Sequence, residues 1–355
     1  MSRKSVNKRE KIDRVTITTT TMRVKKVEKR LLKYDELPDY MKDNDFILDY
    51  YRCEWPLKDT FLSVFCWHNE TLNIWTHLGG FLIFAAMAVA TLMESSKGDG
   101  AISNFLRTSF IATPLMTMLT MNRNNGSRNT TQGGHHGNFS ESSLLDTSAE
   151  GTELVPLWPW FVFLAGAMCC LVFSSVSHLL ACHSKRLTRF FWSLDYAGIS
   201  VMIVCSFYAP VYYCFYCQPL FSLFYLTSIT ILGILAIITL FTPSLAQPQF
   251  RAFRACLFLG MGFSGLIPSV HATALHWDHP QLLVALGYEV LMGILYATGA
   301  WFYVSRVPER WKPGFFDLAG HSHQIFHVFV VGAALTHSAA IMILLHWRQG
   351  TPTCL

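Results

Sequence analysis

Long apolar stretches separated by short polar segments make up most of the chain after residue 71. A helix needs about 20 predominantly apolar residues to cross the hydrocarbon core of a bilayer. Seven stretches reach that length: 72–93, 156–182, 191–217, 219–243, 255–275, 281–304 and 321–347. Their residues do not alternate between polar and apolar as in membrane barrels, and a helix satisfies its own backbone groups in lipid. The pattern predicts an all-α membrane protein whose residues 72–347 form a seven-transmembrane helix bundle.

The composition is that of a membrane protein. Of the 355 residues, 52% are hydrophobic and 14% are charged, whereas a soluble domain carries about 25% charged residues. Residues 1–60 hold 15 of the 28 Lys and Arg residues and 11 of the 23 Asp and Glu residues. The rest of the chain therefore has too few charges to cover a water-exposed surface. The net charge of +5 reflects membrane topology, and we expect no nucleic acid partner.

Basic residues in the loops between these stretches indicate the orientation. Positively charged residues of short loops stay on the cytoplasmic side of the membrane. With the N-terminus inside, 23 of the 28 Lys and Arg residues fall inside and five fall outside. The sequence therefore predicts a cytoplasmic N-terminus and an extracellular or lumenal C-terminus, in the plasma membrane or an endomembrane.

Two segments outside the apolar stretches have distinctive compositions. Residues 1–34 form a basic tail that we expect to be flexible and cytoplasmic. Residues 94–155 form a long outer loop rich in Gly, Asn, Ser and Thr, which we expect to be a disordered insert. Three glycosylation sequons, at Asn125, Asn129 and Asn138, agree with an outer position for that loop.

Residues 35–71 form a cytoplasmic juxtamembrane region before the first apolar stretch. Its candidate helix N-caps are Asp43, Asn44 and Asp45. Apolar residues recur after them near the helical period, at Phe46, Ile47, Tyr50 and Tyr51. The pattern predicts a short amphipathic helix that lies on the inner membrane surface or docks a partner.

The ten cysteines lie mostly inside the apolar stretches and indicate no paired disulfide framework. Cys214 and Cys217 form one Cys-x-x-Cys pair, but a single pair at the end of an apolar stretch is weak evidence for redox chemistry. We interpret both side chains as packing residues.

Polar side chains from three of the apolar stretches are predicted at one depth. Such groups are costly in a membrane segment and by default mark a functional site. Ser174 and His178 lie near the cytoplasmic end of the second stretch, and Asp195 lies near the cytoplasmic end of the third. His323 and His327 occupy the first two turns of the seventh. At the helical rise all of them fall within about 15 Å of the cytoplasmic boundary, so we expect one site.

The residue types in this group favour a zinc site. His323 and His327 are four residues apart and share one helical face. With His178 they offer three neutral imidazoles, which suit Zn²⁺ best among abundant ions, and an open fourth position is typical of catalytic zinc. Asp195 could then hold or deprotonate a water molecule, and Ser174 could donate a hydrogen bond to a developing oxyanion. A zinc ion that only ties three helices together stays open as the alternative.

Other polar residues of the apolar stretches are better explained by packing. His68 and His77, at the inner end of the first stretch, could line the same cavity, but packing or interfacial hydrogen bonding is the stronger explanation. Glu289 in the sixth stretch favours a helix–helix contact. Pro268 and the glycines before it loosen the fifth stretch, as a packing kink or as a lateral opening.

Together these residues resemble the progestin and adipoQ receptor family. The motifs that carry the resemblance are HNETLNIWTHL, the Ser174–His178 spacing, LDYAGIS at Asp195, RVPER and SHQIFHV. The segment LPDYMKDNDFILDYYRCEW is similar to the plant branch of that family, the heptahelical transmembrane proteins. The resemblance covers about residues 32–346.

The resemblance implies seven helices, a cytoplasmic N-terminus and a zinc ion near the cytoplasmic face. The ligands would be His178, His323 and His327, with Asp195 contacting the ion through water and Ser174 beside it. Animal adiponectin receptors are linked to slow hydrolysis of the ceramide amide, and plant members to hormone and abiotic-stress signalling. Glu289 stands where an apolar residue is expected in the animal receptors, so the shape of their cavity does not carry over. A plant-type sequence also argues against adiponectin as the ligand.

Three functional hypotheses follow. The first is a membrane receptor or signal transducer whose residues 1–71 contact an unidentified cytoplasmic signalling protein. The second is a zinc-dependent amide hydrolase that acts on ceramide-type sphingolipids among the membrane lipids. The third, a haem-binding electron carrier, ranks last because a histidine pair four residues apart chelates one small ion. Whether the chain is an enzyme, and whether it forms a homo-oligomer, is left open by the sequence.

Overall fold

The computed structural model describes residues 30–95, 155–242, 245, 247–351 and 354. Within this part of the chain, seven helical spans are long and apolar enough to cross a membrane. They are α2 (Thr71–Ser95), α5 (Trp158–Leu180), α6 (Lys185–Cys214), α7 (Pro219–Leu240), α8 (Arg251–Phe263) with α9 (Leu266–Leu275), α10 (Pro280–Ser305) and α11 (Ser322–Gly350). The described residues contain no strand and a single isolated bridge, between Leu32 and Tyr51. The predicted all-α architecture with seven spans is confirmed, while the side of the membrane on which each terminus lies stays a prediction.

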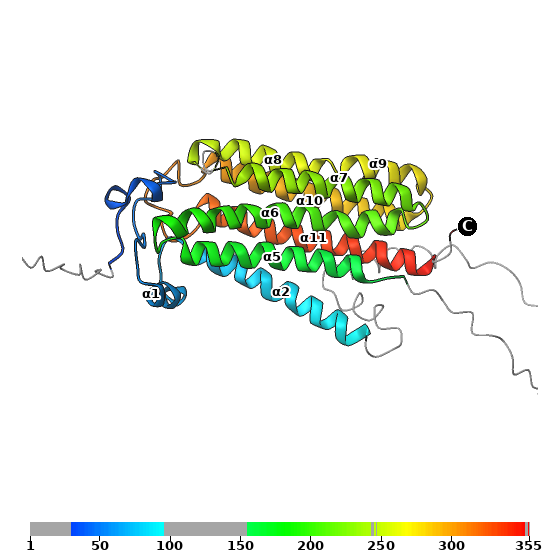
Figure 1. Cartoon of the computed structure of the whole chain (residues 1–355), viewed down its shortest axis with the longest axis horizontal. Helices are drawn as coiled ribbons and strands as arrows, with labels where there is room; N and C mark the ends of the chain where they lie inside the picture. The colour runs from blue at the N-terminus through cyan, green and yellow to red at the C-terminus, as the bar shows by residue number, and fades with distance from the viewer. Residues whose placement is uncertain (1–29, 96–154, 243–244, 246, 352–353, 355) are drawn as a thin grey trace, which may run out of the picture.

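The helices lie side by side in one elongated bundle, with α2 along one side and α7, α8 and α9 along the other (Figure 1). The principal helix contacts join α5 to α6 and to α2, and α10 to α11. Helix α11 also contacts α2 and α6. In the 18-residue apolar stretch of α11, 67% of the residues are buried, whereas in the corresponding stretch of α10 only 17% are buried. Helix α11 is therefore the central helix, and residues on it reach several neighbours.

Glycines let two pairs of helices approach closely. A Cβ atom placed on Gly166 of α5 would lie 2.4 Å from the Cβ atom of Cys205 on α6. One placed on Gly233 of α7 would lie 2.3 Å from the Cγ2 atom of Val204, also on α6. Real side chains do not pack at such distances. These two glycines therefore set the spacing of α5, α6 and α7.

The fifth span is broken between α8 and α9. Ser264 and Gly265 form a tight turn in which Gly265 N–H donates to Gly262 O at 3.1 Å. Pro268 lies four residues after Ser264, and a proline lacks the N–H that would continue the helix to that carbonyl. The predicted loosening of this stretch by Pro268 and its glycines is thus confirmed as a break in the helix.

The N-terminal segment does not form the expected amphipathic helix. Residues 42–56 contain turns and bends but no helix, and the nearest helices are the 3₁₀ turns η1 (Tyr34–Glu36) and η2 (Asp39–Met41), then α1 (Leu57–Leu62) and η3 (Ser63–Phe65). The prediction of a helix capped at 43–45 is wrong. The side chain of Asn44 instead accepts a hydrogen bond from Phe46 N–H at 3.2 Å, and Leu48 N–H donates to the Asp317 carboxylate at 2.9 Å.

The backbone of this segment therefore makes hydrogen bonds to residues far away in the sequence, such as Asp317, rather than to its own neighbours in a helix. Tyr50 also has a left-handed backbone, with φ of 67°, which an α-helix does not contain. Ile47 and Tyr51 still turn inward and form a small apolar cluster with Leu37. The segment lies across one end of the bundle (Figure 1). The predicted tail up to residue 29 and the outer loop from 96 to 154, with its three sequons, lie outside the described residues.

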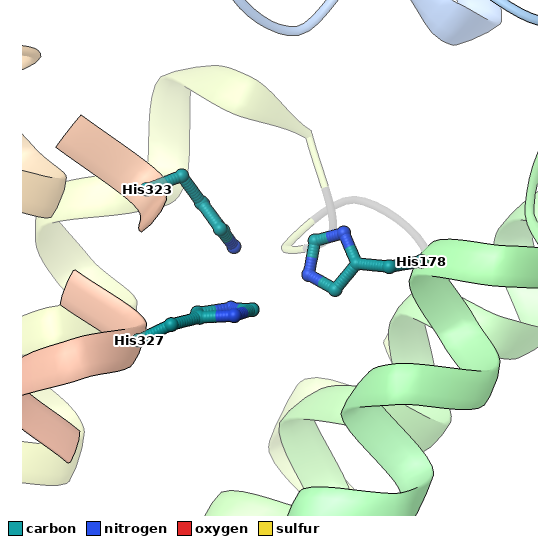
Figure 2. Close-up of side chains that lie close together, drawn as sticks. All are labelled: His178, His323 and His327. Carbon is teal, nitrogen blue, oxygen red and sulfur yellow. The ribbon is translucent and has the colours of Figure 1, made fainter. Parts of the chain in front are cut away.

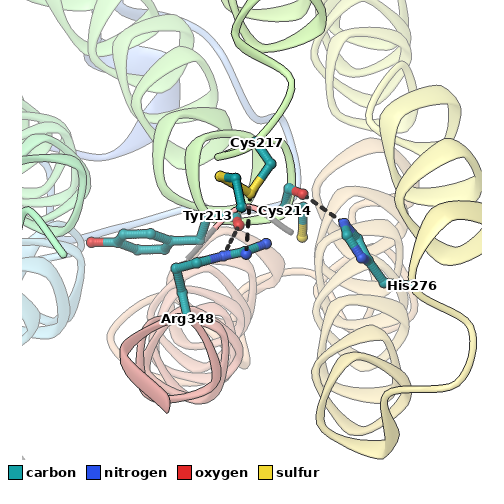
Figure 3. Close-up of a disulfide and its surroundings, with 6 residues drawn as sticks. Tyr213, Cys214, Cys217, His276 and Arg348 are labelled. Atoms are coloured by element: carbon teal, nitrogen blue, oxygen red, sulfur yellow. Dashed lines mark hydrogen bonds between the residues drawn. A yellow bond between two sulfur atoms is a disulfide. The ribbon is translucent and has the colours of Figure 1, made fainter. Parts of the chain in front are cut away.

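A disulfide joins Cys217, after α6, to Cys354 near the end of the chain (Figure 3). The expectation that the cysteines form no pair is therefore wrong for these two, whereas Cys214 is a buried free thiol as a packing residue would be. Their 137-residue separation in sequence explains why no local spacing revealed the pair. Arg348 supports the junction, because its Nε donates to Tyr213 O at 3.0 Å.

Candidate metal centre

Three histidines from two helices converge at one point inside the bundle (Figure 2). His178 comes from the last turn of α5, and His323 and His327 come from the first turns of α11. One ring nitrogen of each histidine lies within 4.8 Å of those of the other two. The structure therefore brings together the three side chains that the sequence predicts as metal ligands.

Hydrogen bonds orient two of the three rings. His178 Nδ1 lies 2.7 Å from a carboxylate oxygen of Glu70, and His327 Nδ1 lies 3.2 Å from the backbone carbonyl oxygen of Asn73. Both partners accept a hydrogen bond, so each Nδ1 carries a proton and each Nε2 keeps a free lone pair. Metal-binding histidines are commonly held in this way, with the second ring nitrogen bonded to a carboxylate or carbonyl.

The donor set fits a zinc ion. Among the residues that the structure describes, the buried Nε2 atoms of His178 and His323 have no hydrogen-bond partner, which is costly unless another group takes their lone pairs. Tetrahedral zinc places its nitrogen ligands about 2.0–2.1 Å from the ion, and ring nitrogens that all lie within 4.8 Å of one another would reach that geometry by small side-chain rotations. Imidazole nitrogens in a buried site suit zinc among the abundant divalent ions.

Glu70 is a residue of this site that the sequence analysis did not identify. It directly precedes α2, and besides contacting His178 its carboxylate accepts a hydrogen bond from Asn73 Nδ2 at 2.6 Å. Burial alone would raise the pKa of Glu70, but His178 and Asn73 stabilise the charged form and lower it below the ordinary value. The sequence feature that could have identified Glu70 is its position in HNETLNIWTHL, two residues after His68.

The two other histidines near this end of α2 differ in role. His77 stacks on His327, with ring centroids 3.6 Å apart, and lines the same cavity as His323 and His327. His68 lies outside the span, where its Nδ1 accepts from Glu70 N–H at 3.1 Å and its Nε2 donates to Ser63 O at 3.2 Å. Burial and the nearby Arg52 guanidinium lower the pKa of His68 to about 3. Its hydrogen bonds hold the turn before α2, which agrees with a packing role.

Asp195 and Ser174 line the same cavity as the histidines. Asp195 on α6 is buried, lies beside Ser174 of α5, and is close enough to His178 to interact with it electrostatically. The five residues predicted to form one site are therefore neighbours. A carboxyl group and a hydroxyl group therefore lie next to the three histidines.

A cavity of about 460 Å³ extends from the histidines along the interior of the bundle. Most of its wall is apolar and comes from α6, α8, α9, α10 and α11, with Phe207, Leu259 and Met292 as representative side chains. Gly265 and Pro268, at the break in the fifth span, also line it. Its volume is in the range of about 300–1,000 Å³ typical of ligand pockets, and its lining suits a hydrocarbon chain.

A polar pair of one half-buried and one buried side chain lies farther along this cavity. Glu289 of α10 lies 3.0 Å from His337 Nδ1, and His337 Nε2 donates to the Ser206 carbonyl oxygen of α6 at 3.0 Å. His337 of α11 therefore contacts both α10 and α6, which confirms the helix–helix contact expected for Glu289.

Comparison with known proteins gives consistent matches. The family model described as haemolysin-III related matches residues 65–338. The chain is 53% identical over 331 residues to heptahelical transmembrane protein 3 of Arabidopsis thaliana, covering 93% of this chain and 91% of that protein. It is 44% identical to heptahelical transmembrane protein ADIPOR1 of Oryza sativa subsp. japonica, covering 92% and 87%. It is 34% identical to the adiponectin receptor protein of Drosophila melanogaster, covering 92% of this chain and 62% of that protein.

Proposed function

This chain belongs to the haemolysin-III-related family, with plant heptahelical transmembrane proteins and an adiponectin receptor among its relatives, and we propose that it is a multi-pass membrane receptor that carries zinc on His178, His323 and His327. The observation that supports the proposal best is the convergence of these three histidines, two of which, His323 and His327, line a largely apolar cavity. The cavity would take an amphiphilic ligand, and the site would lie on the cytoplasmic side. By resemblance to plant relatives, the signal would be hormonal or related to abiotic stress.

Arg52 provides a physical connection from the metal site to the N-terminal segment. It is almost fully buried, and its guanidinium donates to the carbonyl oxygens of His178 at 2.7 Å and Leu179 at 3.1 Å. It also donates to Ser63 Oγ at 2.6 Å. A change at His178 therefore acts on the segment that we propose to face the cytoplasm, where a signalling partner would bind.

Hydrogen exchange tests this connection. Removing zinc from the purified protein with a chelator should increase amide exchange in residues 50–54, because Arg52 loses a fixed acceptor when the end of α5 loosens. The amides around Cys217 and Arg348, at the opposite end of α11, serve as an internal control and should not change. Unchanged exchange at 50–54 would contradict transmission through Arg52.

A zinc-dependent amide hydrolase acting on ceramide-type lipids is the second candidate. Asp195 and Ser174 favour it, because both line the cavity beside the histidines. Bound zinc would supply a Lewis acid that polarises an amide carbonyl. Asp195 would accept a proton from water and Ser174 would donate a hydrogen bond to the carbonyl oxygen, while the apolar wall would hold the acyl chain and exclude bulk water.

Turnover measurements separate the two candidates. A hydrolase should release free fatty acid from ceramide, and Asp195→Asn should abolish release while zinc stays bound. His178→Ala should lose both zinc and turnover, whereas His346→Ala, which removes an exposed histidine of α11, should keep both. If the zinc-loaded wild-type protein releases no fatty acid, the hydrolase proposal fails and a receptor with structural zinc remains.

A further inference from the structure

A second cavity lies at the end of the bundle that carries the N-terminal segment. It has a volume of about 330 Å³ and lies between the start of α8, the end of α10 and the N-terminal segment. Its charged lining residues are Arg251, Arg306 and Arg310, and none of the residues that line it is acidic. It shares no lining residue with the cavity of the histidines.

Two of the three arginines are held in place by carboxylates that lie outside the lining. Arg251 is buried and donates to the Asp43 carboxylate at 2.6 Å. Arg306 donates to the Asp45 carboxylate at 2.5 Å and to the Asp43 carbonyl oxygen at 2.6 Å. The side chains of Asp43 and Asp45 are each 60% exposed, so an incoming anion can exchange with them. The positions of these two carboxylates mark where the oxygen atoms of a bound anion would receive hydrogen bonds from the arginines.

Unused donors remain around this cavity. Arg310 is exposed, and its guanidinium has no hydrogen bond or ion pair within the described part of the chain. The Nε atom of Arg251 is buried and has no acceptor in the described ranges of the chain. Three arginines opposite two exchangeable carboxylates leave a net attraction for a phosphate group.

The surroundings of the cavity are those of a membrane–water interface. Trp301, Trp311 and Phe315 lie within five residues in sequence of the lining residues Val304 and Arg310 and are 55%, 72% and 73% exposed, and aromatic side chains are enriched where a membrane protein meets the headgroups. Its remaining wall includes apolar side chains such as Phe46 and Val304. A free phosphate ion would use only the arginines, whereas a lipid would also cover the apolar surface.

The geometry points to a binding site for the phosphate headgroup of an anionic lipid, drawn from the leaflet that adjoins the N-terminal segment. The phosphate contacts Arg310, Arg306 and Arg251 in competition with Asp43 and Asp45. Basic pockets between transmembrane helices bind anionic headgroups in this way. Lipid binding would release the Asp43–Asp45 stretch and so connect leaflet composition to the position of the N-terminal segment.

The test titrates the purified full-length protein in detergent with dioctanoyl phosphatidic acid, with dioctanoyl phosphatidylcholine and inorganic phosphate as comparison ligands. Arg310→Gln should weaken phosphatidic acid binding about fivefold and Arg306→Gln with Arg310→Gln about 25-fold. Arg186→Gln is the matched control, because it removes an exposed charge at the same end of the bundle and should leave binding unchanged. Asp43→Asn with Asp45→Asn should tighten binding.

Each alternative outcome overturns the assignment. Equal weakening by Arg186→Gln would indicate unspecific surface attraction, and equal affinity for phosphatidylcholine would remove the headgroup specificity. Displacement of the lipid by inorganic phosphate at the same concentration would make the site a phosphate site rather than a lipid site. Because Arg310 is exposed, its variant should melt at the wild-type temperature, which keeps a folding defect from explaining the result.

Discussion

Replacing Glu70 tests whether His178 binds the metal through Nε2. The Glu70 carboxylate lies 2.7 Å from His178 Nδ1 and accepts a second bond from Asn73 at 2.6 Å, so it fixes both the tautomer and the rotation of the ring. Loss of such a partner lowers metal affinity about 10–100-fold. Glu70→Gln keeps an acceptor oxygen but removes the charge, so we expect a loss near tenfold. Glu70→Ala removes both, so we expect a loss near 100-fold, or about 2.7 kcal/mol.

The assay is a competitive zinc titration of detergent-purified protein against a chromophoric chelator. Glu54→Gln serves as control, because it removes an exposed carboxylate from the N-terminal segment and should leave zinc affinity unchanged. The melting temperature of the zinc-free variants separates a weakened site from a general loss of stability. Wild-type zinc affinity in Glu70→Ala would refute the reasoning, since His178 would then need no anionic partner to act as a ligand.

Three further predictions concern the bundle itself. Reduction of the Cys217–Cys354 disulfide should lower the free energy of unfolding of the wild-type protein by about 2–4 kcal/mol and so lower its melting temperature. The melting temperature of the double Cys→Ser variant should not respond to reductant. Glu289→Leu alone should destabilise the protein by about 1–3 kcal/mol because it leaves Nδ1 of the buried His337 without its partner, and adding His337→Phe should recover part of the loss in a double-mutant cycle. Gly166→Ala should lower the melting temperature by several degrees because its methyl group meets α6.

Controls and contrary outcomes for these variants follow from the same contacts. A wild-type melting curve that does not respond to reductant would contradict the stabilising role of the disulfide. Additive losses in the Glu289 and His337 cycle would mean that the two side chains are energetically independent despite their 3.0 Å contact. Gly287→Ala is the matched glycine control, since nothing lies within 4 Å of its Cβ position, and equal destabilisation by both alanines would contradict the packing argument.

Much of the fold was predictable because lipid imposes strong rules on sequence. Each span must be apolar over about 20 residues, so the seven stretches predict the helices to within a few residues at most ends. Helix α6 is the largest exception. It begins at Lys185 rather than 191, because its first five residues include three exposed charged side chains, Lys185, Arg186 and Arg189, which ended the apolar stretch. The clustering of the histidines was predictable for a similar reason, because helical rise converts sequence position into depth.

Contacts between distant segments were not predictable. Glu70 reaches His178, which is 108 residues away, and Cys217 reaches Cys354, which is 137 residues away; neither pair has a local spacing that reveals it. The helix expected at 43–51 does not form, because Asn44 and Leu48 donate hydrogen bonds to the carboxylates of Glu309 and Asp317 in a distant loop. Tertiary hydrogen bonds of this kind override local helix signals.

Zinc-edge X-ray absorption of the purified wild-type protein tests the central claim most directly. The account predicts about one zinc ion per chain, with roughly three imidazole nitrogens at about 2.0–2.1 Å and one further light-atom ligand. His323→Ala with His327→Ala should abolish that signal. A protein purified without zinc under metal-replete conditions would contradict the account. So would an ion coordinated by sulfur at about 2.3 Å.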